Sequence, residues 1–83
     1  MRLITYTPLA LKQLEKLDRM WAMRIREKIR QYADDPVGLA NQVKALKGSK
    51  GLRLHVGDYR VIFTADAKVL FIIKVGHRRD IYE

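Results

Sequence analysis

Hydrophobic positions follow two periods along the chain, a helical one before Asp34 and an alternating one after Gly51. Residues 3–6 are mostly β-branched or aromatic and predict a short first strand. Thr7 and Pro8 then mark a helix start, because a threonine hydroxyl caps the first amides and proline fits the first helical position. The helical stripe that follows consists of Ala10, Leu14, Leu17 and Met20 or Trp21.

A second helical stripe extends the pattern to the next proline; its members are Ala22, Ile25, Ile29, Tyr32 and Ala33. The weak break at Asp18-Arg19 predicts two helices joined tightly as a hairpin. Pro36 disfavours helical geometry in the residue before it, so the second helix is expected to end there. Residues 37–51 predict a loop, whose apolar residues either form a helical turn or pin it to the core.

Beyond Gly51 the alternation predicts a β-hairpin with Gly57-Asp58 as its two-residue turn. Such a turn places His55 directly opposite Arg60, and opposed residues point to the same face of a sheet. The face toward the helices then carries Leu52, Leu54, Val56, Tyr59, Val61 and Phe63. The other face carries Arg53, His55, Arg60 and Ile62.

The nearly unbroken apolar segment 69–75 predicts a third strand in the centre of the sheet. An odd-numbered turn at 66–68 points Phe71, Ile73 and Val75 to the core and leaves Leu70, Ile72 and Lys74 beside the cations; a slip of one residue reverses this. Gly76 is expected to end the strand. The order β-α-α-β-β-β predicts one α+β domain over residues 1–83, an N-terminal strand and a two-helix hairpin packed on an antiparallel sheet of about four strands.

The charge of the chain points to a polyanionic partner. Lys and Arg number 17 against 9 Asp and Glu, which gives a net charge of +8 at pH 7. Nucleic acid is the foremost candidate, and an acidic protein fits as well. Cysteine is absent, which excludes disulfides, thiol catalysis and cysteine zinc sites. The longest apolar run, residues 69–73, is too short to span a bilayer, so we expect a cytoplasmic chain with no membrane partner.

The basic residues of the outer sheet face are the candidate site. Each of Arg53, His55 and Arg60 alone reads most simply as a solvated surface position. Together they repel one another without an acidic neighbour on that face of the hairpin, which predicts an anionic or apolar partner. The C-terminal block adds Arg78, whose guanidinium suits phosphate oxygens, and Tyr82. RNA-binding contributions are expected from His77, Arg79, Lys74, Lys47 and Lys50.

Several kinds of chemistry are disfavoured by the residues present. Ser49 is the single serine and lies in a Gly/Lys loop, which argues against a serine triad. Two histidines without cysteine or suitably spaced carboxylates predict no metal site, and no phosphate-binding glycine loop or other cofactor motif occurs. Arginine, histidine and tyrosine suit metal-free RNA cleavage best, because the ribose 2′-hydroxyl is the nucleophile and cations stabilise the phosphorane charge.

Two blocks of the sequence resemble the RelE/ParE toxin superfamily, on its RelE side. They are residues 51–63, which contain Val-Gly-Asp-Tyr-Arg, and residues 73–82, which contain Gly-His-Arg-Arg-Asp-Ile-Tyr. The resemblance covers nearly the whole chain. It implies a toxin of a type II toxin–antitoxin system, an endoribonuclease that cuts messenger RNA in the ribosomal A site without a metal or cofactor. The alternatives are a ParE-like toxin, which inhibits DNA gyrase and is not a nuclease, and a non-catalytic RNA- or ribosome-binding module.

The resemblance also implies a small RelB-like antitoxin that wraps the toxin in a hetero-oligomer. An acidic, amphipathic antitoxin segment is expected to cover either Ile62, Leu70 and Ile72 on the outer sheet face or the helical hairpin.

Individual roles follow from the same resemblance. Arg60 matches the arginine that holds the scissile phosphate, and Arg78 the basic residue assigned as general acid or transition-state stabiliser. Tyr82 matches the terminal tyrosine that orients or deprotonates the 2′-hydroxyl. Arg53 and His55 stand where the best-studied enzymes carry two lysines, which leaves the general base open. We hypothesise that His55, kept neutral by the two neighbouring arginines, takes the proton instead of Tyr82.

Overall fold

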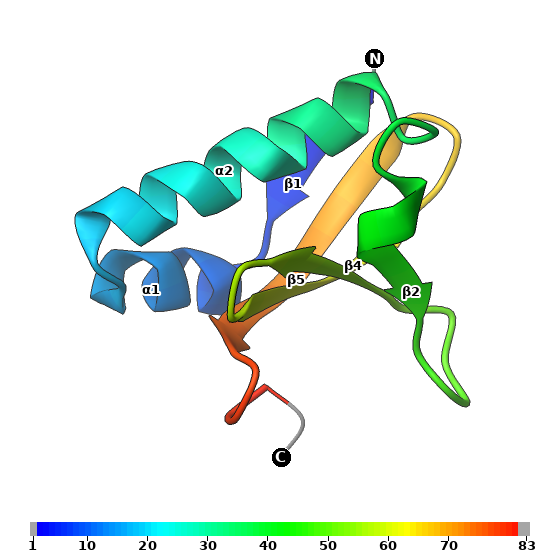
Figure 1. Cartoon of the computed structure of the whole chain (residues 1–83). Coiled ribbons are helices and arrows are strands. Elements are labelled where there is room, and N and C mark those ends of the chain that lie inside the picture. Colours follow the sequence, from blue (N-terminus) through cyan, green and yellow to red (C-terminus); the bar gives the residue numbers. More distant parts are fainter. Residues whose placement is uncertain (1, 82–83) are drawn as a thin grey trace.

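A computed structural model describes residues 2–81 and shows a sheet with two helices on one face (Figure 1). The elements are β1 (Leu3–Tyr6), α1 (Pro8–Lys16), α2 (Arg19–Asp34), a 3-10 turn (Ala40–Gln42), β2 (Val43–Ala45), β3 (Leu52–Val56), β4 (Tyr59–Ala65) and β5 (Val69–His77). Within the described residues the strand order is β1-β5-β4-β3-β2. The predicted α+β class is confirmed, and β1 pairs parallel to β5 while the other neighbours pair antiparallel.

The two helices begin at the predicted caps. The Thr7 hydroxyl accepts the Ala10 N–H at 3.0 Å, and Pro8 occupies the first position of α1. The Asp18 carboxylate accepts the Met20 N–H at 3.1 Å and starts α2. The hairpin is tight, as predicted, because only Leu17 and Asp18 separate the two helices. Neither helix in residues 2–81 combines the length and apolar character that crossing a bilayer requires.

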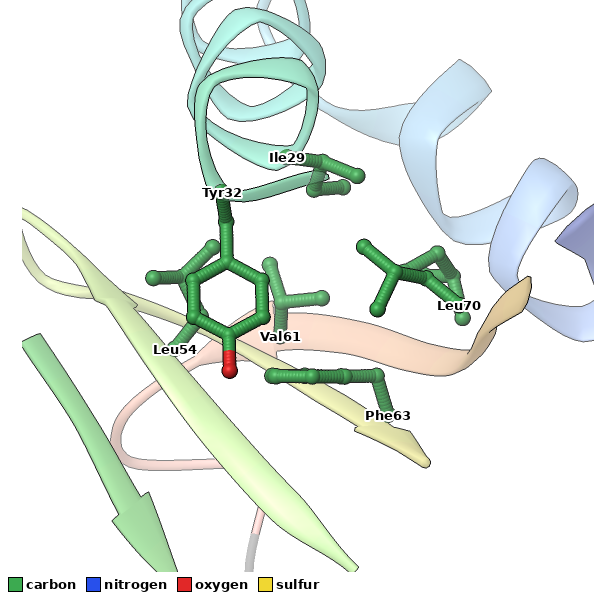
Figure 2. Close-up of a pocket in the computed structure, with 7 residues that line it drawn as sticks. Ile29, Tyr32, Leu54, Val61, Phe63 and Leu70 are labelled. Carbon is green, nitrogen blue, oxygen red and sulfur yellow. The ribbon is translucent and has the colours of Figure 1, made fainter. Parts of the chain in front are cut away.

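The core lies between the helices and the sheet. The helices bury Ala10, Leu14, Ile25, Ile29, Tyr32 and Ala33, all members of the predicted stripes. Figure 2 shows Tyr32 projecting from α2 among sheet residues, and its ring meets that of Phe63 edge-on with centroids 5.3 Å apart. The space enclosed by these side chains has no room for a water molecule, so it is packed core rather than a ligand site.

The register of the β3–β4 hairpin is the predicted one. Val56 pairs with Tyr59, His55 with Arg60 and Arg53 with Ile62. The core face of the hairpin is therefore as predicted, with Leu54, Val56, Val61 and Phe63 buried.

The predicted faces of β5 were wrong for the residues before the bulge at Ile73. Ile62 pairs with Lys74 but Phe63 pairs with Ile72, so Ile73 is an extra residue in a β-bulge. The bulge turns Leu70 and Ile72 into the core, each 1% exposed, whereas Phe71 is 40% exposed on the outer face. Val75 and Lys74 keep their predicted faces. Leu70 and Ile72 are thus not available to cover the cations or to meet an antitoxin.

Two further expectations were wrong. The segment predicted as a loop contains β2, which pairs with β3 and adds a strand to the predicted sheet. Gly76 does not end β5, because the strand continues to His77 and pairs there with Tyr59. The chain turns only after His77.

Candidate nucleic-acid interface

The sheet surface away from the helices gathers basic side chains from four adjacent strands, and we call it the cationic face. Lys44 pairs with Arg53, Arg53 with Ile62, Ile62 with Lys74, and Arg60 with both His55 and Gly76. Directly paired residues share a face, so the register alone places the members together. The cationic face consists of Lys44, Arg53, His55, Arg60 and Lys74.

Lys44 is the member that sequence reasoning missed. It belongs to β2, and only the pairing of β2 with β3 brings it opposite Arg53. The signal in the sequence was Val43, an apolar residue next to a lysine, which is too short an alternation to distinguish a strand from a loop.

The turn between β3 and β4 holds the two arginines of greatest interest. The Arg60 Nη1 donates to the carbonyl oxygens of Gly57 and Tyr59, each at 2.9 Å. The Arg78 backbone N–H donates to the carbonyl of Asp58 at 2.8 Å, and its Nε lies 3.8 Å from the Asp58 carboxylate. Three consecutive carbonyl groups at one turn therefore position the Arg60 guanidinium and the Arg78 backbone.

The turn itself is shaped by glycine and tryptophan. Gly57 has a φ of +60°, which glycine adopts without steric cost. A side chain on Gly57 would meet the Trp21 ring, because its Cβ would lie 2.6 Å from Cη2. The Trp21 ring in turn contacts the Tyr59 ring at a tilt of 42°, with ring centroids 5.0 Å apart. Helix α2 thus packs against the turn whose carbonyl groups bind both arginines.

The C-terminal turn sits on the outer side of the sheet. Ile81 is 4% exposed, and a Cβ on Gly76 would lie 3.2 Å from its Cδ1. The Ile81 N–H donates to the His77 carbonyl at 3.1 Å. Because Gly76 is paired with Arg60, this packing holds residues 78–81 beside the cationic face.

The His55 imidazole lies among the cations of the cationic face, and its pKa is lowered. Burial, and then the charges of Arg60, Arg53 and Lys44, lower the pKa of His55 below its ordinary value of 6.5. The direction agrees with the hypothesis made from the sequence, with burial as the larger cause. The buried Nε2 atom has no hydrogen-bond partner among the described residues. The lowered pKa favours the uncharged form of the imidazole, and neighbouring groups cover its Nε2 atom.

Carboxylates leave most of the cationic face uncompensated. Among residues 2–81 the ion pairs join Arg30 to Glu27 on α2 and Arg78 to Asp58. Neither involves Lys44, His55, Arg60 or Lys74. The Arg78–Asp58 pair is solvent-exposed on both sides and contributes about 1 kcal/mol or less, so a phosphate competes with it readily.

The other predicted residues of the C-terminal segment fall in three places. His77 lies on the helix side of the sheet, where its ring meets Tyr59 edge-on at 5.6 Å, so it is not part of the cationic face. Arg79 is exposed in the C-terminal turn, and its N–H donates to His77 Nδ1 at 3.2 Å. Tyr82 lies outside the described residues.

The two predicted lysines of the 46–51 loop are exposed. Lys47 lines an open groove of ≈ 560 Å³ together with Arg53. Lys50 belongs to the same loop but is not among the residues that line the groove. The loop therefore extends the basic surface beyond the edge of the sheet.

Solved structures share this fold. A chain of the archaeal RelE–RelB complex from Pyrococcus horikoshii is 26% identical, with a TM-score of 0.78 and coverage of 95% of this chain and 97% of that one. A chain of the RelBE2 toxin–antitoxin complex from Mycobacterium tuberculosis is 21% identical, with a TM-score of 0.80 and coverage of 93% and 98%. YafQ from Escherichia coli is 14% identical, with a TM-score of 0.81 and both chains covered to 100%.

The sequence comparison points the same way. No curated protein sequence matches the chain. The family model described as the ParE toxin of type II toxin–antitoxin systems, parDE, matches residues 4–82. This match includes both sequence blocks on which the resemblance to the RelE/ParE superfamily was based. The chain therefore belongs to the ParE toxin family of type II toxin–antitoxin systems.

Proposed function

We propose that this toxin is a ribosome-dependent endoribonuclease that cleaves messenger RNA through attack of the ribose 2′-hydroxyl on the adjacent phosphate. The observation that supports it most is the β3–β4 turn, whose carbonyl groups bind Arg60 and the backbone of Arg78 next to a sheet face rich in cations. A phosphorane gains its charge in the transition state, and fixed cations stabilise that charge without reorganisation. This chemistry needs no cofactor.

Arg60 is assigned to the scissile phosphate. Its Nη1 is engaged by two carbonyl groups, which orient the guanidinium plane, and planar donors suit phosphate oxygens. Lys44, Arg53 and Lys74 add positive charge along the path of the RNA backbone. Arg78 follows the end of β5, and we assign it to the leaving 5′-oxygen, where a cation stabilises the developing negative charge.

The general base is either Tyr82 or His55. A base must be uncharged on the nitrogen that takes the proton, and the lowered pKa of His55 meets this condition near neutral pH. If His55 is the base, His55→Gln removes the acidic limb of the pH–rate profile as well as most of the rate. If Tyr82 is the base, Tyr82→Phe abolishes cleavage and His55→Gln keeps the wild-type rate at every pH.

Mapping of messenger RNA ends in cells tests the proposal. Cells expressing the wild type are expected to show cuts in phase with codons within minutes, and cells expressing Arg60→Ala or Arg78→Ala to show none. Arg30→Ala is the matched control, because Arg30 is a comparably exposed arginine on α2, away from the cationic face. Intact messages with the wild type, or cuts that persist in Arg78→Ala, would refute the proposed mechanism.

Inhibition of DNA gyrase is the second candidate function. The match to the ParE family model favours it, whereas the arrangement of Arg60 and Arg78 favours the nuclease. The same induced cells distinguish the two, because a gyrase inhibitor breaks chromosomal DNA and leaves messages uncut.

A RelB-like antitoxin is the proposed partner. The solved relatives include RelE–RelB complexes, and the positive charge of the cationic face suits an acidic segment. Two exposed apolar residues, Leu3 at 71% and Phe71 at 40%, replace the predicted Leu70 and Ile72 as apolar positions on the outer side of the sheet.

A further inference from the structure

The β-bulge in β5 decides which side chains of its last residues join the cationic face. On one side of the bulge, Phe63 pairs with Ile72; on the other, Ile62 pairs with Lys74. Because side chains alternate along a strand, removing the extra residue Ile73 from the register would turn Lys74 toward the helices. Gly76, which pairs with Arg60 and supports Ile81, would turn with it.

A bulge also changes the direction of backbone N–H and C=O groups. Here those groups form hydrogen bonds with Gln13 of α1 and with Thr7, the N-cap residue of α1. The carbonyls of Ile72 and Ile73 point the same way, and Thr7 donates to both, from its N–H at 3.0 Å and from its hydroxyl at 2.6 Å. Two residues later the Val75 N–H points to the same side, where β1 has already ended. The Gln13 side chain takes the place of the missing strand, and its Oε1 accepts the Val75 N–H at 2.7 Å.

We propose that Gln13 is a positioning residue, whose hydrogen bond to the Val75 amide holds the bulged register that puts Lys74 on the cationic face. The bond spans 62 residues and is partly buried, so without Gln13 the Val75 amide would lose its partner at a site shielded in part from water. Without the bulge, the Val75 N–H would point to β4 instead, and Gln13 would lose its hydrogen-bond donor. The role in RNA binding rests on the proposed function; the role in the register does not.

Three variants separate the hydrogen bond from simple packing. Gln13→Met keeps the length and volume of the side chain but accepts no strong hydrogen bond, whereas Gln13→Glu keeps an acceptor at the same place. Gln31→Met is the matched control, because Gln31 is an exposed glutamine on α2. Thr7 is not a clean test, because its hydroxyl also caps α1.

Amide hydrogen exchange and NMR cross-strand contacts report the register directly in the full chain. Gln13→Met is expected to speed exchange at the Val75 amide by about tenfold or more, the size of one lost hydrogen bond, and to weaken the contacts of Lys74 with Ile62. Gln13→Glu and Gln31→Met are expected to leave both unchanged. If Gln13→Met fails to fold, Gln13→Asn, which is too short to reach Val75, takes its place.

Binding of an RNA oligonucleotide at several salt concentrations reports the consequence for the site. If Lys74 leaves the cationic face, the slope of log affinity against log salt falls by about 0.7, the value for one phosphate contact on a single strand. Lys74→Ala is expected to give the same change in slope. Gln13→Met is expected to add nothing in the Lys74→Ala background, because both variants remove the same contact of Lys74 with a phosphate. A loss of stability alone leaves this slope unchanged.

Two results would overturn the inference. One is a Val75 amide that stays protected in Gln13→Met. The other is a salt slope or exchange rate that changes as much in Gln13→Glu as in Gln13→Met. If the wild type cuts no RNA in any assay, the nuclease proposal fails while the exchange and cross-strand data still judge the role of Gln13.

Discussion

Replacing Gly57 by alanine tests how strongly the β3–β4 turn is constrained. A φ of +60° costs an alanine about 1–2 kcal/mol relative to glycine. The new Cβ would also lie 2.6 Å from Trp21, so the indole must move. Moving the indole disturbs its contact with the Tyr59 ring and with the Arg24 guanidinium 5.2 Å from the indole centroid, which adds about 1 kcal/mol. We expect a total loss of about 2–3 kcal/mol in the free energy of unfolding.

Gly48→Ala is the matched control for this substitution. Gly48 has a φ of +70°, but a Cβ there meets nothing within 4 Å, so only the conformational cost of about 1–2 kcal/mol remains. Urea denaturation gives the free energy of unfolding of both variants, and RNA cleavage or binding gives the effect on the site. Gly57→Ala is expected to lose more stability than Gly48→Ala and to lose activity as well, because the turn carbonyls hold both arginines. Equal losses in the two variants would show that Trp21 does not constrain the turn.

Other substitutions test separate parts of the structure. Ile81→Ala is expected to lower the free energy of unfolding by about 2–4 kcal/mol in urea denaturation, because Ile81 is buried. Leu11→Ala is the control and is expected to cost less, because Leu11 is 40% exposed. Equal losses in the two variants would contradict the packing of Ile81 on Gly76. Because the pKa of His55 is lowered on folding, the unfolded chain binds its proton first as the pH falls below 6.5, so stability declines with falling pH from 6.5 down to the folded pKa. His55→Gln is expected to flatten this decline in urea denaturation above and below pH 6.5, and an unchanged slope would contradict it. Lys44→Ala is expected to raise the pKa of His55 in an NMR titration, and an unchanged pKa would show that the lysine does not act on the imidazole.

The hairpin was predictable because its register depends on local chemistry. Gly57-Asp58 selects a two-residue turn, and the turn fixes every pair along β3 and β4. The pairing of His55 with Arg60, and hence the centre of the candidate site, followed from the sequence alone. The helix starts were predictable for the same reason, since Thr7 and Asp18 cap amides a few residues away.

The remaining parts depend on contacts between distant segments. The side-chain hydrogen bonds at the bulge come from Thr7 to Ile73, across 66 residues, and from Val75 to Gln13, across 62 residues, so the strand itself carries no sign of the bulge. β2 has three residues and exists as a strand only through pairing with β3, which is why Lys44 was overlooked. His77 was misplaced because Gly76 reads as a strand end, whereas Ile81 packs on it and the pairing continues.

The parallel pairing of β1 with β5 has a consequence during translation. Tyr6 and Ile72, which this pairing joins, are 66 residues apart, so β1 emerges from the ribosome long before the strand with which it pairs. β5 lies between β1 and β4, and a nascent chain without it has a divided sheet and a slow, non-local step still ahead. Lys74 and Arg78 also arrive with this late segment. The cationic face is therefore assembled only after β5 has joined the sheet, because Lys74 lies on that strand.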